Sequence, residues 1–405
     1  MTSATPWLGT KRVAFVPLFR SHAVPPDQIP PNWENVILNR VLFNPRPEAN
    51  GADRSLSAWL QAVSLRRADI EPLVLPMQTI ARQNVLPWDL DGIPWQGETL
   101  GQFLRNQGVQ AAQLVMLGGR PSGTSAGFWS RVVMAESNGL WLMELIHSLT
   151  GFVDLYPFPN DTDPVDRNIG AFDQMSATSQ THPTIFTKNE LGWLGAGCIG
   201  RYQFGSSSGQ TGFILLNNSS PPQFTPPDCN SGGVFAVRIG DDFPYVMVES
   251  RRKTDQFETG MSSTGDPQEM GITSEGVIAY RVQIRNATNN VREGGKIPLY
   301  LLTQTALRVG ESMVLDNGAT LRVGVETPKG HIILMEDPIA ETVIVPWVSG
   351  ANAEDARRAL EEKGLVADFS GPMLNSEVLR QTPDGQTVVT KGSTVHLLMH
   401  KITNL

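Results

Sequence analysis

The sequence contains only two cysteines, Cys198 and Cys229, among its 405 residues. Two cysteines allow at most one internal disulfide, and they cannot supply the thiolates of a four-cysteine zinc module. A scaffold held together by several disulfides is therefore excluded. The separation between the two residues permits a bridge, but we favour two buried free thiols and leave their pairing open.

Long apolar runs are also absent, because no stretch approaches the roughly 18 residues that a membrane-spanning helix needs. The best candidate, Gly139–Ile146, is interrupted by Glu144. Near the N-terminus, the apolar stretch Val13–Phe19 is too short for a secretory signal and contains Pro17. We therefore expect no membrane span and a cytoplasmic protein. The alternatives are export by a non-classical route or incorporation into a larger particle.

Positive charge is scarce, since 32 Lys and Arg residues face 40 Asp and Glu residues and the net charge is −8. Binding to nucleic acid needs a basic face, so nucleic acid is excluded as a first hypothesis. We expect the short basic clusters Arg66–Arg67 and Arg251–Lys253 to be solvated. The apolar fraction of 40% is ample for a folded core, and 38 glycines with 29 prolines indicate many turns and short strands.

Roughly the first 200 residues alternate strand-like and helix-like segments. The hydrophobic periodicity predicts strands at 11–19 and 113–117 and helices at 55–63, 100–107 and 139–150. This alternation is typical of a mixed α/β domain.

The pattern changes after about Tyr202, where short apolar runs are bounded by Gly, Pro, Asn and Ser. Together with the turn Asn317–Gly318, these runs predict an antiparallel sheet or sandwich. The last sixty or so residues change again: Asn352 can cap a helix over Ala353–Lys363, which Gly364 ends, and strand-like runs lie on both sides. We therefore divide the chain into domains at 1–205, 206–340 and 341–405.

The most informative segment is Met143-Glu-Leu-Ile-His147, inside the predicted helix 139–150. In the HExxH motif, two histidines four residues apart share one helix face and bind zinc, and the Glu between them is the general base. Here Met143 stands at the first histidine position. Glu144 and His147 stand at the positions of the base and the second ligand.

This segment and those that follow resemble the immune inhibitor A-like family of zinc metallopeptidases. Asp154-Leu-Tyr156 resembles the family's third-ligand motif, and Gly170–Ser176 resembles its Met-turn, with Met175 as the methionine under the metal. His182–Trp193 is similar to a later family segment that ends in Leu-Gly-Trp. The resemblance implies an α/β (α+β) metzincin-like fold in which Glu144 is the general base.

The same resemblance implies that His147 and Asp154 are zinc ligands, but Met143 replaces a third. A thioether is a weak zinc donor, and two ligands are too few to hold a catalytic metal. There is also one extra residue between His147 and Asp154. We therefore predict a catalytically impaired pseudo-peptidase that has no cofactor or weakly bound zinc, and that serves as a binding or assembly component for a protein or peptide partner.

Three alternatives stay open. Glu144 and His147 can have a purely structural role in a relic helix. Glu144 and His147, an E-x-x-H pair, can also co-ligate a metal together with Asp154. Finally, the chain can be an active zinc endopeptidase of the immune inhibitor A type, with His182 as the nearest candidate for the missing ligand.

The C-terminal segment resembles a PASTA domain through Val345–Gly350, the helix ending at Gly364, Gln381–Gly385 and Val389–Val395. The resemblance implies a small α+β module of a kind usually found outside the cytoplasm. It also implies cell-wall glycan as a partner, although we favour a docking or spacer role for a single copy.

Two segments, Gly123–Gly127 and Gly205–Gly209, fit the pattern Gly-x-Ser-x-Gly. A nucleophile elbow needs a strand running into the first Gly and a helix leaving the second. Neither segment has this context, so we predict plain turns.

Overall fold

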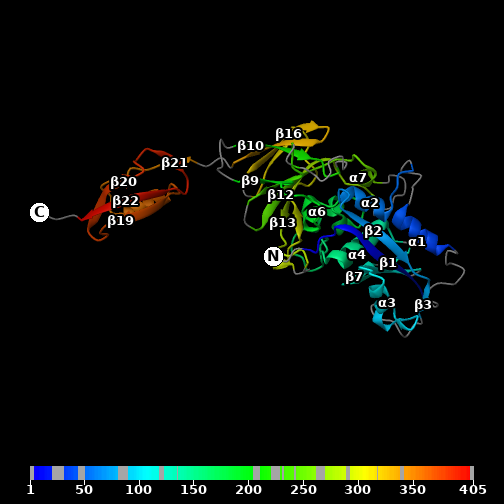
Figure 1. The fold of residues 1–405 in the computed structure, drawn as a ribbon. Coiled ribbons are helices and arrows are strands. Elements are labelled where there is room, and N and C mark those ends of the chain that lie inside the picture. The colour runs from blue at the N-terminus through cyan, green and yellow to red at the C-terminus, as the bar shows by residue number, and fades with distance from the viewer. Residues whose placement is uncertain are drawn as a thin grey trace. The chain divides into compact units, whose positions relative to one another are not determined.

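The computed structural model describes residues 4–20, 32–43, 51–80, 90–117, 123–134, 136–203, 210–219, 229, 232–240, 243–260, 270–288, 292–316, 318–337 and 342–401. The chain divides into two compact units, Met1–Asp337 and Pro338–Leu405. In Figure 1 the larger unit runs from blue to orange and the smaller unit is orange to red.

The larger unit begins with a mostly parallel sheet, whose described strands follow the order β2–β1–β6–β8–β7, with β3 beside β1. Every residue of the central strand β6 is buried, as expected for a parallel strand that is covered on both faces. Only the edge strand β7 runs antiparallel to its neighbour. The strands are β1 (Gly9–Arg20), β2 (Ala68–Val74), β3 (Gln78–Ile80), β6 (Ala111–Met116), β7 (Gly123–Ala126) and β8 (Trp129–Val133).

Helices cover both faces of this sheet (Figure 1). Successive side chains of a strand point to opposite faces, so Phe15 packs into one core and Val16 into another. The first core includes α1 (Trp33–Leu42), α2 (Leu56–Val63) and α4 (Asn138–Thr150). The second includes α3 (Leu100–Asn106) and Trp95 of the hairpin β4 (Pro94–Trp95) and β5 (Glu98–Thr99). The predicted mixed α/β arrangement is confirmed.

Two further sheets form the β-rich part of this unit. One has the order β14–β13–β12–β11–β9 and the other the order β10–β17–β16–β15. All described neighbours are antiparallel except β9 and β11, so the predicted sandwich of antiparallel strands is largely confirmed. The strands are β9 (Ile199–Tyr202), β10 (Gln210–Leu216), β11 (Ala236–Ile239), β12 (Tyr245–Arg251), β13 (Gly276–Val282), β14 (Leu299–Leu301), β15 (Ser312–Val314), β16 (Thr320–Thr327) and β17 (Gly330–Glu336).

The five-stranded sheet contributes to two cores. On β12, Val248 packs between the sheets with Ile333 of β17, whereas Met247 belongs to the same core as α4. The strand β9 precedes residue 205 but pairs with β11, which follows it. The division at residue 205 therefore stays a prediction, and it would separate strands of one sheet.

Among its described residues, 342–401, the smaller unit contains one helix, α8 (Ala353–Glu361), which packs on a small sheet. The Asn352 side chain accepts a hydrogen bond from the Asp355 backbone at 2.9 Å, which confirms the predicted helix cap. The described strands are β18 (Thr342–Ile344), β19 (Val366–Ser370), β20 (Ser376–Thr382), β21 (Val388–Thr390) and β22 (Thr394–Lys401). Leu360, Val395 and Leu397 are fully buried in its core.

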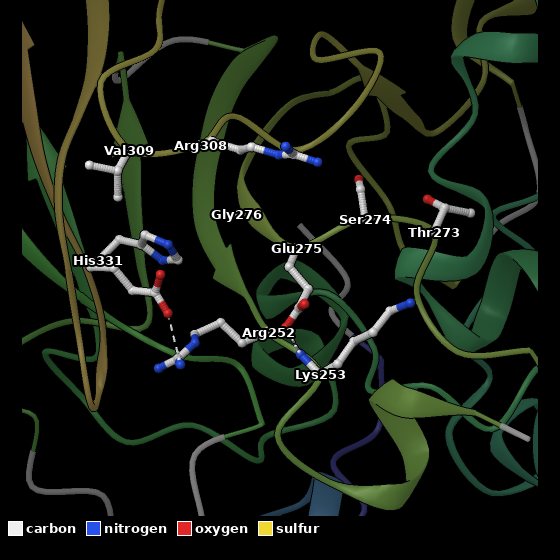
Figure 2. Close-up of a pocket in the computed structure, with 10 residues that line it drawn as sticks. Arg252, Lys253, Thr273, Ser274, Glu275, Gly276, Arg308, Val309 and His331 are labelled. Atoms are coloured by element: carbon white, nitrogen blue, oxygen red, sulfur yellow. Dashed lines mark hydrogen bonds and ion pairs between the residues drawn. The ribbon is translucent and has the colours of Figure 1, made fainter.

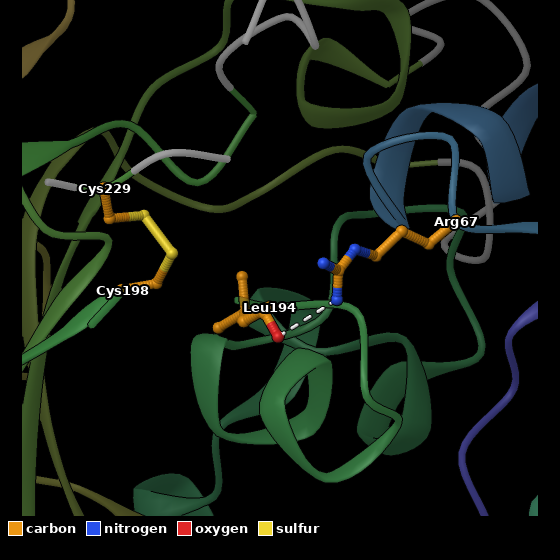
Figure 3. Close-up of a disulfide and its surroundings, with 4 residues drawn as sticks. All are labelled: Arg67, Leu194, Cys198 and Cys229. Atoms are coloured by element: carbon orange, nitrogen blue, oxygen red, sulfur yellow. Dashed lines mark hydrogen bonds between the residues drawn. A yellow bond between two sulfur atoms is a disulfide. The ribbon is translucent and has the colours of Figure 1, made fainter. Parts of the chain in front are cut away.

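Cys198 and Cys229 form a disulfide, so the expectation of two free thiols is wrong (Figure 3). Their Cα atoms lie 5.0 Å apart, within the range that a disulfide requires, because the chain returns to the start of β9. Sequence separation alone does not determine this approach. On the other side of the same loop, the Arg67 side chain donates to the carbonyl of Leu194 at 3.2 Å, so the segment before β9 is held at both ends.

Candidate functional site

Helix α4 carries the segment that the HExxH pattern singles out. Ser137 caps its N-terminus by accepting a hydrogen bond from the Leu140 backbone at 3.2 Å. Gly151 ends the helix in the left-handed conformation, with φ of 70°, and the chain turns back towards His147. The helix backbone approaches the Thr178 carbonyl so closely that a Cβ at Gly139 would overlap it. These constraints fix the position of Glu144 and His147.

Both ring nitrogens of His147 contact other groups of the protein. Its Nε2 lies 2.9 Å from Asp154 Oδ1, and its Nδ1 lies 2.5 Å from the carbonyl oxygen of Phe152. A carbonyl oxygen only accepts, so Nδ1 carries a proton, and the carboxylate favours a second proton on Nε2. Burial lowers the pKa of His147, but the hydrogen bond and charge of Asp154 outweigh this effect and raise the pKa above its usual value. Both ring nitrogens of His147 are therefore engaged by groups of the same chain.

Glu144 is buried beside this pair and beside strand β7. Burial raises its pKa to about 7, and the nearby Asp154 adds to the rise, while His147 and a hydrogen bond with Ser125 oppose it. Its Oε2 atom is buried without a hydrogen-bond partner within the described ranges. Tyr156 completes the cluster: burial, followed by the charge of Asp154 and a hydrogen bond to it, raises the pKa of Tyr156 to about 12. Sequence reasoning missed the contribution of Ser125.

The residues present do not fit a catalytic zinc ion. Met143 is buried in the main core and offers only a thioether, which is a poor zinc ligand. His147 and Asp154 contact each other, so Asp154 already engages Nε2 of the one histidine in this segment. Across the described residues, no group of three or more His, Cys, Asp or Glu side chains is arranged to hold a metal ion.

Met175 lies next to the site through its backbone. Its carbonyl oxygen accepts a hydrogen bond from the Leu155 backbone at 2.9 Å, and its side chain is fully buried in the main core. The short helix α5 (Gln174–Ala177) is capped by Asp173. The structure therefore brings the segments of Asp154 and Met175 together.

His182 does not join this site, so the alternative in which it supplies a missing ligand is wrong. Its Nε2 lies 2.7 Å from Asp255 Oδ2, and its Nδ1 lies 3.1 Å from the Nζ atom of Lys188. Lys188 lies on α6 (Ile185–Glu190), and Asp255 caps α7 (Gln256–Thr259). Both ring nitrogens of His182 are thus engaged in a separate cluster.

That cluster is a buried charge network, which sequence reasoning did not predict. The Arg251 guanidinium donates to Glu258 at 2.7 Å and to Glu249 at 3.1 Å, and both side chains of each pair are fully buried. The expectation that Arg251 is solvated is therefore wrong. Burial, followed by the charge of Arg251, lowers the pKa of Lys188 to about 7. His182 lies 73 residues before Asp255 in the sequence, so no local pattern predicts that these two segments meet.

The Gly-x-Ser-x-Gly segment at Gly123–Gly127 is not a nucleophile elbow. It lies in β7 and in the tight turn to β8, which runs antiparallel to β7, rather than between a strand and a helix. The prediction of a plain turn is nevertheless wrong for Gly123–Ala126, because these residues form a strand. The second segment, Gly205–Gly209, lies outside the described residues.

Residues 343–401 match the family model of the PASTA domain. PASTA domains typically bind the peptidoglycan of the cell wall. No curated protein matches the chain. The metallopeptidase resemblance of the larger unit receives no support from these comparisons. None of the described helices is long and apolar enough to cross a membrane.

Proposed function

We propose that this chain is a cell-wall-binding protein. Its PASTA domain attaches it to peptidoglycan, and its larger unit is a non-catalytic, metallopeptidase-like component that binds a protein or peptide partner. The observation that carries the first half is the match of residues 343–401 to the PASTA domain. The observation that supports the second half is the pairing of His147 with Asp154, beside Met143 at the first ligand position.

The absence of peptidase activity follows from the chemistry of the donor set. Peptide hydrolysis by Glu144 would need a metal-polarised water, and the ligands for that metal are too few. The alternative function, an active zinc endopeptidase, requires a third ligand from outside the described residues.

We also propose that the protein works in an oxidising compartment. The Cys198–Cys229 disulfide supports this, because disulfides persist outside the reducing cytosol. The PASTA domain is consistent with the same location. Protein isolated from its native source without reductant should contain no titratable thiol before denaturation and reduction, and two after it. Two free thiols in the isolated native protein would favour the cytoplasmic alternative.

Sedimentation with purified peptidoglycan sacculi tests the cell-wall proposal. The full chain should appear in the pellet, and a chain that ends at Asp337 should stay in the supernatant. Chitin of the same mass is the control polysaccharide and should retain neither. Equal retention of both chains on sacculi would contradict the role of the PASTA domain.

An assay with casein and a broad peptide library tests the lack of peptidase activity. We expect no cleavage that a chelator inhibits. Glu144→Gln is the matched variant, and it should behave as the wild type does. Robust hydrolysis that both the chelator and Glu144→Gln abolish would establish the endopeptidase alternative instead.

A further inference from the structure

The larger unit contains a polar cavity of about 530 Å³, away from Glu144 and His147 (Figure 2). It lies where β12 ends and β13 begins, and the β16–β17 hairpin and the segment 306–311 form its other walls. A volume of this size is typical of sites for small molecules. The residues that matter for its chemistry are Arg252, Lys253, Ser274, Glu275, Arg308 and His331.

The walls of the cavity are fixed by backbone hydrogen bonds. Val277 and Leu307 exchange two such bonds at 2.8 Å each, and the Ala306 backbone donates to Ser274 Oγ at 2.9 Å. A Cβ at Gly276 would overlap the carbonyl oxygen of Leu307, so only glycine allows the two segments to approach this closely. The cavity is therefore preformed.

Two of the charged groups already have contacts within the chain. The Arg252 guanidinium forms an ion pair with Glu326 at 2.8 Å and donates to the carbonyl of Thr327 at 3.0 Å. The Glu275 carboxylate accepts from the Lys253 backbone at 2.7 Å. Within the basic cluster Arg251–Lys253, the Arg252 side chain is therefore engaged by the protein rather than freely solvated.

Two cationic groups remain uncommitted. Neither the ammonium of Lys253 nor the guanidinium of Arg308 has a hydrogen bond or ion pair with any residue in the described ranges. Figure 2 shows the Arg308 side chain extending towards Ser274 and the Lys253 side chain extending towards Thr273, while the Glu275 carboxylate points to the backbone of Lys253. The Ser274 hydroxyl accepts from Ala306, so its own proton is available to a ligand.

His331 provides a buried polar group in the wall of the cavity. Its Nδ1 lies 2.8 Å from Ser250 Oγ, which fixes the ring, and Nε2 has no partner within the described ranges. Burial lowers the pKa of His331 below its usual value, so the ring is neutral near pH 7. The histidine can therefore hydrogen-bond to a hydroxyl group without adding charge.

We propose that this cavity binds a small hydroxylated anion, a sugar acid or a sugar phosphate. Arg308 and Lys253 hold the carboxylate or phosphate group through charge-assisted hydrogen bonds. Ser274, Glu275 and His331 bind the hydroxyl groups. None of the residues that line this cavity belongs to the PASTA domain or to the segment around His147.

Titration calorimetry of the full chain at low ionic strength tests the proposal, with glucuronate, glucose 6-phosphate and glucose as probes. We expect binding of at least one anion, and the comparison of the two distinguishes a carboxylate site from a phosphate site. Glucose, which lacks the charge, should bind at least about ten-fold more weakly. Arg308→Gln and Lys253→Gln should each weaken binding of the anion by about ten-fold.

The matched control is Arg380→Gln, which changes an exposed arginine of β20 in the smaller unit and should leave the affinity unchanged. Lys253 and Arg308 are exposed, so their variants should keep the thermal stability of the wild type. The proposal is wrong if neither anion binds, if glucose binds as well as the anions, or if both cavity variants bind as the wild type does. Sedimentation with sacculi is measured separately, so either proposal can fail without the other.

Discussion

The segment from Met143 to Asp154 differs from a working zinc site by contacts as well as by composition. Nε2 of His147 contacts Asp154 and Nδ1 contacts the Phe152 carbonyl, so a metal ion would have to displace the contact at the nitrogen that it binds. Met143, one turn earlier on the same face, is packed in the core. Its conversion to a ligand therefore tests how much of the site remains.

We expect Met143→His to bind one zinc ion per chain, whereas the wild type binds none tightly. The new imidazole would face the same side of α4 as His147 and complete a set of two histidines and Asp154. Without zinc, the variant should be less stable than the wild type, because a polar ring replaces a buried thioether. Calorimetry with zinc measures the binding.

The control for this experiment is the double variant Met143→His with His147→Ala, which should lose the zinc ion again. If Met143→His binds no zinc, the contacts of His147 or the extra residue before Asp154 keep the site closed.

Glu144 should make the stability of the larger unit depend on pH. Its pKa is 4.5 in the unfolded chain and about 7 in the folded one, so the folded state binds the proton more tightly. The resulting stabilisation is complete below pH 4.5 and disappears as the pH rises through 7. Because one unit of pKa is worth about 1.4 kcal/mol, the rise from 4.5 to about 7 makes the loss at most about 3.5 kcal/mol.

Denaturant unfolding of the wild type and Glu144→Gln from pH 4.5 to 8 measures this dependence. The decline in the free energy of unfolding with rising pH should be shallower in the variant. Glu377→Gln, in the smaller unit, is the matched control and should follow the wild type. Identical slopes for wild type and Glu144→Gln would mean that the carboxyl group is ionised throughout.

At the scale of elements, the close packing of α4 against the segment after α5 is the most demanding contact. A methyl group at Gly139 has no room beside the Thr178 carbonyl, and both partners are backbone, which cannot rotate away. We expect Gly139→Ala to lower the free energy of unfolding of the larger unit by about 3 kcal/mol, measured by urea denaturation.

Gly212→Ala, on β10, is the matched control. A Cβ there would meet Leu334 at 3.6 Å, an ordinary contact, so little loss is expected. Equal stability of both variants would show that α4 can shift away from Thr178.

The same elements show what the sequence could and could not predict. The helices α2, α3 and α4 were predictable to within a residue or two, because apolar spacing and capping residues are local signals. The helix α1 was missed, since few of its residues, Ile37 and Val41, are buried. Disulfide pairing and the contact of His182 with Asp255 were not predictable, because the partners lie 31 and 73 residues apart in the sequence.

For the candidate sites, too, some contacts could be predicted from the sequence and others could not. The resemblance to metallopeptidases implied one site for His147 and Asp154, and the two side chains are in contact. The cavity around Arg308 did not, because its walls come from four separate segments and its cations look like ordinary surface charges in the sequence. A pattern that reads neighbours along the chain cannot detect groups that converge from distant strands.

At the scale of the whole molecule, we expect two thermal transitions, one for each compact unit. The five-stranded sheet supplies residues to two cores of the larger unit, so its α/β and β-rich parts should unfold together. Differential scanning calorimetry of the full chain and of a chain ending at Asp337 should assign the transitions. The shorter chain should show only the transition of the larger unit. A third transition would support an independent domain boundary near residue 205.

Because one sheet belongs to both cores, we expect a ligand at the ends of its strands to stabilise the entire larger unit. The cavity touches the end of β12 and the start of β13, and these strands also form the core that contains α4. Occupancy at a hundred-fold excess over Kd stabilises a folded unit by about 2.7 kcal/mol. A sugar acid or sugar phosphate that fills the cavity should therefore protect the amides of α4 from hydrogen exchange, although it touches none of them, and leave those of α8 unchanged.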